Sequence, residues 1–246
     1  MGLEYARQLA AQGYDLLLVS NREEELSPAR EALQAAWPVS VTTRFQDLAV
    51  PDAADRLFAW CTDELQQLPD ILINNAGMFF FKELEAADLD RVQAMVNLHV
   101  CTITRSCLLF GEAMKKRGSG RILIMASMAA RIPAPGITIY SATKAYLRSF
   151  GRSLSYELKP YGVSVTTVCP AAIATPLYRL DEKKMKLGVR LRVIHTPQWL
   201  VRKALRAMHR GRRVISPSSM NVWLPAAISL LPGPVIAFLW KKLKSI

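Results

Sequence analysis

Tyr140 and Lys144 stand four positions apart in the segment Tyr-Ser-Ala-Thr-Lys. Residues at positions i and i+4 share one face of a helix, so the lysine ammonium is expected to lie near the tyrosine hydroxyl. A nearby positive charge favours the ionised form of a phenol, and a phenol tuned in this way can act as a general acid or base. Chance matches to this spacing are frequent, and an ordinary exposed helical pair is the alternative.

Other polar residues stand where strands are expected to end or helices to be buried. Ser127 ends an apolar run before Tyr140, so its hydroxyl is expected at the carboxyl edge of a sheet, where ligands bind. Residues 74–77, Asn-Asn-Ala-Gly, follow the preceding strand and predict a sharp turn. Asn97 lies in an apolar helical segment, where a buried amide needs a hydrogen-bond partner or a function. This context favours an active site over a surface pair.

The elements that must position these residues alternate along the chain. Apolar runs predict strands, and segments with polar and apolar faces predict helices between them. The fold class is therefore α/β, with a doubly wound, Rossmann-like parallel sheet in three α/β/α layers. The expected strands are residues 14–20, 39–45, 70–74, 121–127, 163–169 and 213–215, and the expected helices are 22–36, 51–67, one within 88–116, 139–159 and 197–210.

The sequence begins with Met-Gly-Leu-Glu, already at the first helix. A doubly wound nucleotide-binding domain usually opens with a central strand and a glycine-rich turn. Without that strand, the backbone groups of its neighbours lack ladder partners. We therefore expect a truncated or misassigned start, with a degenerate fragment as the alternative. We divide the chain into a catalytic domain, residues 1–216, and a hydrophobic lid or membrane-associating tail, residues 217–246.

Composition excludes several functional classes. Hydrophobic residues make up 51% of the chain and charged residues 21%, so an intrinsically disordered protein is not expected. Four cysteines without a Cys-x-x-Cys pair indicate a reduced, cytoplasmic protein, and three histidines without ligand spacing predict no metal site. The formal net charge of +12 is not accompanied by a nucleic-acid-binding motif, so no nucleic-acid partner is expected.

Taken together, these motifs resemble the short-chain dehydrogenase/reductase family. The likeness extends from Gly2 to about Ile215, and the order and spacing of the motifs are far more specific than any single one. It rests on Asp47-Leu48, Asn74-Asn75-Ala76-Gly77, Asn97, Ser127, Tyr140 with Lys144, and Cys169-Pro170 followed by Ile173 and Thr175.

The resemblance implies a role for each of four catalytic residues. Tyr140 would give a proton to a carbonyl oxygen during reduction, or take it from a hydroxyl during oxidation. Ser127 would hydrogen-bond the same oxygen and stabilise its developing charge. Lys144 would bind the nicotinamide ribose and favour ionisation of Tyr140, and Asn97 would hold a water that links Lys144 to solvent.

The resemblance also implies a nicotinamide cofactor. The family's turn has the form T-G-x-x-x-G-x-G, and only its last glycine, Gly2, is present. At the end of the second strand, Asn21 and Arg22 stand where a carboxylate would bind the ribose of NAD, and Arg22 could meet a 2′-phosphate. We therefore predict NADP, with NAD less favoured; the alternative is that Arg22 only caps a helix rich in glutamate.

Further cofactor contacts are carried over from the family. Asp47 and Leu48 would approach the adenine, and Asn75, Ala76 and Gly77 would line the cleft, although Asn75 could equally pin two strands. Pro170, Ile173 and Thr175 would contact the nicotinamide end, and Lys144 and Tyr140 its ribose. The usual Pro-Gly is Pro170-Ala171 here, so the local turn could differ.

Two segments bear on the substrate. Residues 177–193 are basic and amphipathic, and are expected to be a solvated lid or to favour an acidic or membrane-borne substrate. Residues 222–240 carry no charge and are long enough to cross a bilayer, but prolines interrupt them at three positions. They could form a lid over an apolar pocket, a membrane-surface anchor followed by a basic tail, or a spanning helix.

We conclude that the sequence predicts an oxidoreductase that interconverts a ketone and a secondary alcohol with NADP(H). An apolar or lipid-like substrate is favoured. The alternative is a non-catalytic scaffold or interaction protein that has lost cofactor binding. In similar proteins the helices within residues 88–116 and 139–159 form an interface, so a homodimer or homotetramer is expected. The protein is expected in the cytoplasm, and its C-terminus could place it in peripheral contact with a membrane.

Overall fold

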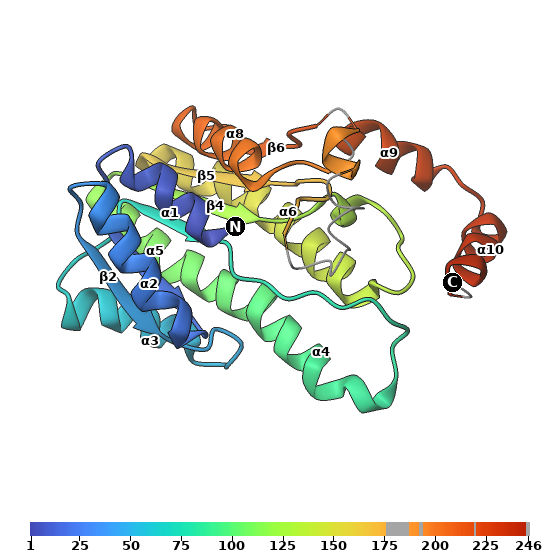
Figure 1. The fold of residues 1–246 in the computed structure, drawn as a ribbon, viewed down its shortest axis with the longest axis horizontal. Coiled ribbons are helices and arrows are strands. Elements are labelled where there is room, and N and C mark those ends of the chain that lie inside the picture. Colours follow the sequence, from blue (N-terminus) through green and yellow to red (C-terminus); the bar gives the residue numbers. More distant parts are fainter. Residues whose placement is uncertain (176–186, 192–193, 219, 245–246) are drawn as a thin grey trace.

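The computed structural model describes residues 1–175, 187–191, 194–218 and 220–244. Its strands pair in parallel wherever they pair, as the sequence predicts. Helices join them and cover both faces, which is the doubly wound α/β/α arrangement (Figure 1). The strands are β1 (Leu16–Ser20), β2 (Val41–Phe45), β3 (Ile71–Asn74), β4 (Gly120–Met125), β5 (Val163–Val168) and β6 (Val214–Ile215).

The strands form two sheets rather than one. β1 pairs with β2, while β3, β4, β5 and β6 follow one another in a second sheet. Among the described strands no ladder joins the two sheets, and β1, β2, β3 and β6 each have a single ladder neighbour.

One helical layer packs on the face that joins the two sheets. It consists of α1 (Gly2–Ala10), α2 (Glu23–Ala36) and α8 (Pro197–His209), with α1 in contact with both others. Their buried side chains share one apolar cluster with residues of β1, β2, β4 and β5. The shared core holds the two sheets together although no ladder joins them.

The other layer holds the long helices that carry the proposed catalytic residues. It contains α3 (Ala53–Ala59) with the π-helical turn η1 (Trp60–Glu64), and then a helical run that begins with η2 (Ala86–Asp88) and α4 (Leu89–Val96). The run continues through a second π-helical turn, η3 (Asn97–Thr102), into α5 (Ile103–Arg117). Residues 88–116 therefore lie in one long helical run, as we predicted, and the π-helical turn within it is a feature that we did not predict.

Helix α6 (Thr138–Leu158) lies close against β5 because it carries a glycine at the contact. A Cβ atom on Gly151 would overlap the hydroxyl of Thr167 on β5. This close approach fixes the height of α6 over the sheet and hence the position of Tyr140 and Lys144 near its amino end. The short helices η4 (Met128–Arg131) and η5 (Lys159–Tyr161) flank α6 in the chain.

The chain ends in two apolar helices, α9 (Met220–Ser229) and α10 (Gly233–Lys244), which project from one end of the molecule (Figure 1). Of the predicted lid at 177–193, residues 177–186 and 192–193 lie outside the described part; residues 187–190 are helical. Among the described residues, one helical run, Ala86–Arg117, is long and apolar enough to cross a membrane. Part of it packs in the core, and core helices pass the same test of length and composition.

Candidate active site

Tyr140 and Lys144 lie together in the first turns of α6, and both are buried. The Lys144 Nζ atom lies 5.5 Å from the centroid of the Tyr140 ring and donates a 2.9 Å hydrogen bond to the carbonyl oxygen of Met125. Burial lowers the pKa of Lys144 to about 8, partly offset by Cys169. The ammonium is therefore held in a site where its proton is easier to lose than in water.

Ser127 lies beyond the end of β4, which stops at Met125, so our prediction that it ends the strand is wrong. Its backbone remains extended, and the residue caps η4 instead. The Ser127 Oγ atom accepts a 3.1 Å hydrogen bond from the backbone N–H of Ala129. This bond uses a lone pair of the Ser127 oxygen and not its hydrogen. The hydroxyl can therefore still donate a hydrogen bond at the carboxyl edge of the sheet.

Asn97 is the first residue of the π-helical turn η3 and is half-buried. Its side-chain oxygen accepts a 2.9 Å hydrogen bond from Gln93, one turn earlier. The Lys144 ammonium donates instead to Met125, so the water link between Asn97 and Lys144 stays a prediction. Turns of π-helix within α-helices occur frequently at functional sites in proteins.

His99, which our sequence analysis did not assign to the site, is completely buried beside Tyr140. Its Nε2 atom accepts a 3.1 Å hydrogen bond from the backbone N–H of Met78. Its Nδ1 atom lies 3.0 Å from the Thr143 hydroxyl oxygen, and its ring meets the Tyr140 ring edge-to-face at 5.9 Å. His99 therefore joins the loop after β3 to the catalytic turn of α6.

The hydrogen-bond network assigns the tautomer of His99. The Thr143 hydroxyl donates to the backbone carbonyl oxygen of Tyr140 at 2.9 Å, so towards His99 it must accept. The Nδ1 atom consequently carries the hydrogen and Nε2 is the acceptor, which describes a neutral ring. Burial, with a smaller contribution from Lys144, lowers the pKa of His99 to about 2. The histidine is thus a fixed neutral bridge rather than a proton donor.

The loop after β3 passes directly over this cluster. A Cβ atom on Gly77 would lie 3.1 Å from the His99 Nε2 atom and 3.8 Å from the Lys144 Nζ atom. A Cβ atom on Gly2, at the start of α1, would lie 3.2 Å from the Asn75 side-chain nitrogen. The structure therefore brings Gly2, Asn75 and Gly77 to one edge, where a ligand could approach the backbone closely. Ala76 lies between them and is exposed.

The residues assigned to the adenine half lie in the loops after β1 and β2. Asp47 accepts a 2.8 Å hydrogen bond from the backbone N–H of Ala49, and the Leu48 carbonyl oxygen accepts one of 2.8 Å from Thr102 on η3. Asn21 and Arg22 are exposed at the end of β1. The Arg22 guanidinium pairs with Glu25 at 2.8 Å. This ion pair is the helix-end arrangement that we gave as the alternative for Arg22.

The segment after β5 carries the residues that we assigned to the nicotinamide end. The Pro170 carbonyl oxygen accepts a 2.8 Å hydrogen bond from the backbone N–H of Met128, which ties this segment to η4. Ile173 is buried and forms a β-bridge with His195, while the Thr175 hydroxyl lies 3.5 Å from the Ile173 carbonyl oxygen. Among the described non-glycine residues only Gln66 has a positive φ, so Ala171 fits here without left-handed backbone.

The residues present fit a nicotinamide cofactor in part. Lys144 has donors beyond its Met125 contact, and the Gly77 backbone crosses beside it without a side chain between. At the phosphate end, Gly2 and the amino end of α1 supply backbone N–H groups, which favour anions. Lys144 and Gly77 could therefore hold the nicotinamide half, and the backbone N–H groups at the start of α1 could bind phosphate.

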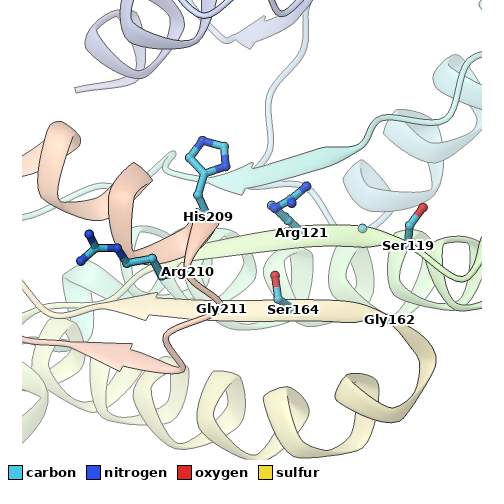
Figure 2. A pocket seen from close by; sticks show the side chains of 8 residues that line it. Ser119, Arg121, Gly162, Ser164, His209, Arg210 and Gly211 are labelled. Carbon is cyan, nitrogen blue, oxygen red and sulfur yellow. The ribbon is translucent and has the colours of Figure 1, made fainter.

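A separate hollow of about 380 Å³ lies at the opposite, amino-terminal edge of the sheet. Figure 2 shows Arg121, Ser164 and His209 around it, on β4, on β5 and at the end of α8. The His209 ring stacks with Tyr14 at 6.4 Å, and its pKa is lowered by burial and, secondarily, by Arg121. This hollow contains none of the predicted catalytic residues and is not part of the candidate active site.

Comparisons with known proteins agree with this geometry. A family model described as short chain dehydrogenase matches residues 1–186. Very-long-chain 3-oxoacyl-CoA reductases from Mus musculus and Homo sapiens are 30% and 31% identical over 74% and 73% of this chain. The chain spans 59% and 58% of the length of these two relatives. A 17-beta-hydroxysteroid dehydrogenase type 3 from Danio rerio is 26% identical over 86% of the chain and 67% of its own length.

A solved structure with a similar fold is a short-chain dehydrogenase from Sphingobium yanoikuyae in complex with NADPH. It is 25% identical, with a TM-score of 0.77, and the match covers 94% of this chain and 93% of that one. The conserved fold, the extent of the family match and the paired Tyr140 and Lys144 support one conclusion. The chain belongs to the short-chain dehydrogenase/reductase family of oxidoreductases.

Proposed function

We propose that this protein interconverts a ketone and a secondary alcohol, with NADP(H) as cofactor and Tyr140 as the acid/base. The observation that carries the proposal is the buried cluster in which the Tyr140 ring is enclosed by Phe79, His99 and Lys144. Three neighbours fix the ring, so its hydroxyl has a defined position relative to Ser127 and the sheet edge. Preorganisation of this kind is what proton transfer requires.

Each residue has a distinct task in the proposed reduction. The Tyr140 hydroxyl donates its proton to the substrate oxygen as charge develops there. The Ser127 hydroxyl, whose oxygen already accepts from Ala129, donates a hydrogen bond to the same oxygen. The Lys144 ammonium lies beside the ring and stabilises the tyrosinate that remains. When bound, the nicotinamide supplies the hydride. The tyrosinate then regains its proton by way of Lys144, and Asn97 would hold the water through which Lys144 is reprotonated from solvent.

The surroundings of Tyr140 favour an apolar substrate. Its buried cluster contains Phe80, Met95 and Ala129, with Phe79 and further apolar side chains packed against it. Two of the similar proteins are named for a very-long-chain acyl thioester and a steroid, which are both largely apolar. We infer a lipid-like ketone, such as a 3-oxoacyl thioester of long chain.

A substrate series tests the proposed function. NADPH oxidation is measured with 3-oxoacyl thioesters of increasing chain length, a steroid ketone and a small polar ketone. We expect kcat/KM to rise with chain length, since each buried methylene contributes about 0.8 kcal/mol, or roughly fourfold. Absence of turnover with every ketone, together with absence of NADPH binding, would instead support the non-catalytic scaffold.

Cofactor preference is tested at Arg22. Replacing Arg22 with alanine is expected to weaken NADPH binding by roughly tenfold and to leave NADH binding unchanged, because only NADPH carries a phosphate for the guanidinium. Binding constants for both nucleotides are measured by nucleotide fluorescence. Arg30→Ala, at another exposed arginine of α2, is the matched control. An equal loss for both nucleotides would refute the assigned phosphate contact.

The remaining assignments follow from this proposal. We assign residues 1–216 to the catalytic unit and residues 217–246 to a hydrophobic lid or membrane-associating tail. Helices α5 and α6 expose Leu108 and Tyr156, which are 57% and 51% exposed, and this favours a homodimer or homotetramer built on these helices. The mass of the protein in solution decides this assignment.

A further inference from the structure

The charge of the protein is strongly segregated along its sequence. Residues 183–246 contain 14 lysines and arginines and no aspartate or glutamate. Residues 1–182 contain the other 18 basic residues and all 20 acidic ones. The last quarter of the chain therefore carries +14, while the preceding part is close to neutral. A region of one charge sign is suited to a partner of the opposite sign.

The outer surface of the two terminal helices is apolar. Trp223 on α9 is 74% exposed, Leu230 between the helices is 83% exposed and Phe238 on α10 is 65% exposed. Isolated exposed apolar residues are common, but three large ones on one projecting element indicate a binding surface. Lys241 and Lys242 are exposed directly after this surface, at the end of α10. We call α9, α10 and the residues between them the terminal helix pair.

Exposed cations are also present on α8 and in the turn after it. They are Arg202, Lys203, Arg206, Arg210 and Arg212. None of them takes part in an ion pair among the residues that the structure describes. The last quarter of the chain thus combines these five exposed cations with exposed apolar side chains.

The inner surface of the terminal helix pair is attached beside the active site. α9 packs against η4, which directly follows Ser127. Trp240 of α10 lies edge-to-face with Phe81 at 5.8 Å and donates a 3.2 Å hydrogen bond to Glu83. Phe81 follows Phe79, which packs on the Tyr140 ring, by two residues. The pair is therefore anchored near the substrate side and exposes its opposite surface.

We propose that the terminal helix pair docks on an anionic membrane surface, with Trp223, Leu230 and Phe238 entering the interfacial region. Apolar side chains that enter the acyl boundary, together with lysines near acidic headgroups, are the features of an interfacial helix. The two helices are bent by 103° relative to each other, so they do not form one straight spanning helix. The docking does not depend on the proposed function, and it places the bilayer on the side of the protein that carries η4 and Phe81.

A second copy of this chain fits the exposed surface of the terminal helix pair less well than an anionic membrane does. A symmetric contact would place the same +14 region against itself, and like charges across an interface oppose association. No carboxylate from residues 183–246 is present to compensate. An acidic lipid surface supplies both the negative charge and the apolar interior that the terminal helix pair requires.

Vesicle co-sedimentation of the full chain tests the proposal. The vesicles are phosphatidylcholine alone, and phosphatidylcholine with about one third phosphatidylserine, a strongly anionic surface. We expect binding to the anionic vesicles, with at least roughly tenfold weaker binding by Trp223→Ser/Leu230→Ser/Phe238→Ser. Lys241→Glu/Lys242→Glu is expected to bind the phosphatidylserine vesicles at least roughly tenfold more weakly, because it replaces two cations that face the acidic headgroups with anions.

The control replaces two exposed apolar residues on other elements, Phe45 and Tyr161, with serine. This variant should bind anionic vesicles as the wild type does. Equal binding by the terminal-pair variant and the wild type would overturn the proposal, as would absence of wild-type binding. A lower oligomer mass of the terminal-pair variant, without a change in vesicle binding, would assign the surface to a second copy instead. Circular dichroism verifies that each variant is folded.

Discussion

Tyr140→Phe is expected to reduce kcat/KM for ketone reduction by about 10²–10⁴-fold, the usual contribution of a positioned acid. The substitution removes one oxygen atom and keeps the ring that packs edge-to-face on Phe79 at 5.0 Å. The variant should therefore stay folded and still bind NADPH, so that the loss of rate reports on the proton donor. The measurements are steady-state NADPH oxidation, nucleotide binding and thermal unfolding on the same preparation.

Helix α6 also supplies the matched control, Tyr146→Phe. The Tyr146 hydroxyl lies 2.8 Å from the hydroxyl of Thr104, and its ring stacks with Phe150 at the protein surface. Removing this oxygen costs a surface hydrogen bond and touches no residue of the proposed site, so the rate should be unchanged. Equal kcat/KM for Tyr140→Phe and the wild type, in an active preparation, would contradict the assigned proton donor.

The sequence was sufficient to place the pair at the centre of the site because helical periodicity is a local property. Tyr140 and Lys144 are separated by one turn of a regular α-helix, so their spacing alone brings the ammonium to the ring. The alternation of apolar runs and helices likewise predicted parallel strands covered on both faces. These features depend on short-range patterns and on the burial of apolar faces.

Features that depend on long-range contacts could not be predicted in the same way. The π-helical turn at Asn97–Thr102 has no clear propensity signal, and it serves to aim His99 and Thr102 at partners far away in the sequence. His99 itself offered one signal, a polar residue in an apolar helix two positions after Asn97. We applied that argument to Asn97 and not to His99, although His99 is the more deeply buried of the two.

Arg22 illustrates a different limit. Its position at the end of β1 suggested a phosphate contact, but the structure shows the guanidinium paired with Glu25. Both side chains of this pair are more than half exposed, and exposed ion pairs contribute little net free energy. A nucleotide phosphate could therefore compete with Glu25 for Arg22. A strand-end position indicates which ligand a side chain can reach and not which partner it has without the ligand.

The bridge made by His99 leads to a prediction about stability and pH. His99 is neutral when folded, with its pKa lowered to about 2, whereas an exposed histidine titrates at 6.5. As the pH falls below 6.5 the unfolded chain gains a proton that the folded protein does not accept at this position. The neutral, buried His99 therefore makes its full contribution to the free energy of unfolding above pH 6.5. As the pH falls, this free energy decreases, by about 2 kcal/mol at pH 5.

The comparison variant is His99→Gln, which removes the titration while keeping an amide for one of the two partners. Its unfolding free energy should depend less on pH between about 7.5 and 5 than that of the wild type, by about 2 kcal/mol. His209→Gln is the comparison: His209 is exposed and its pKa is lowered less than that of His99, so its removal should change the pH dependence by less. Denaturant unfolding at the two pH values measures both differences. An unchanged pH dependence in His99→Gln would contradict the neutral bridge.

His99→Ala is expected to affect both stability and turnover. It leaves the Met78 N–H and the Thr143 hydroxyl without their partner and opens a cavity in the core, at a cost of about 2–4 kcal/mol. Thr143 hydrogen-bonds to the Tyr140 carbonyl oxygen, so the loss of the His99–Thr143 contact removes one of the contacts that hold this turn of α6 in place. We expect kcat to fall by roughly tenfold or more with little change in KM, since misplacement acts on the reacting geometry. His99→Gln should recover part of kcat. Equal loss of kcat in His99→Gln and His99→Ala at matched folded fractions would leave His99 with a packing role only, because the hydrogen-bond bridge would then make no difference to turnover.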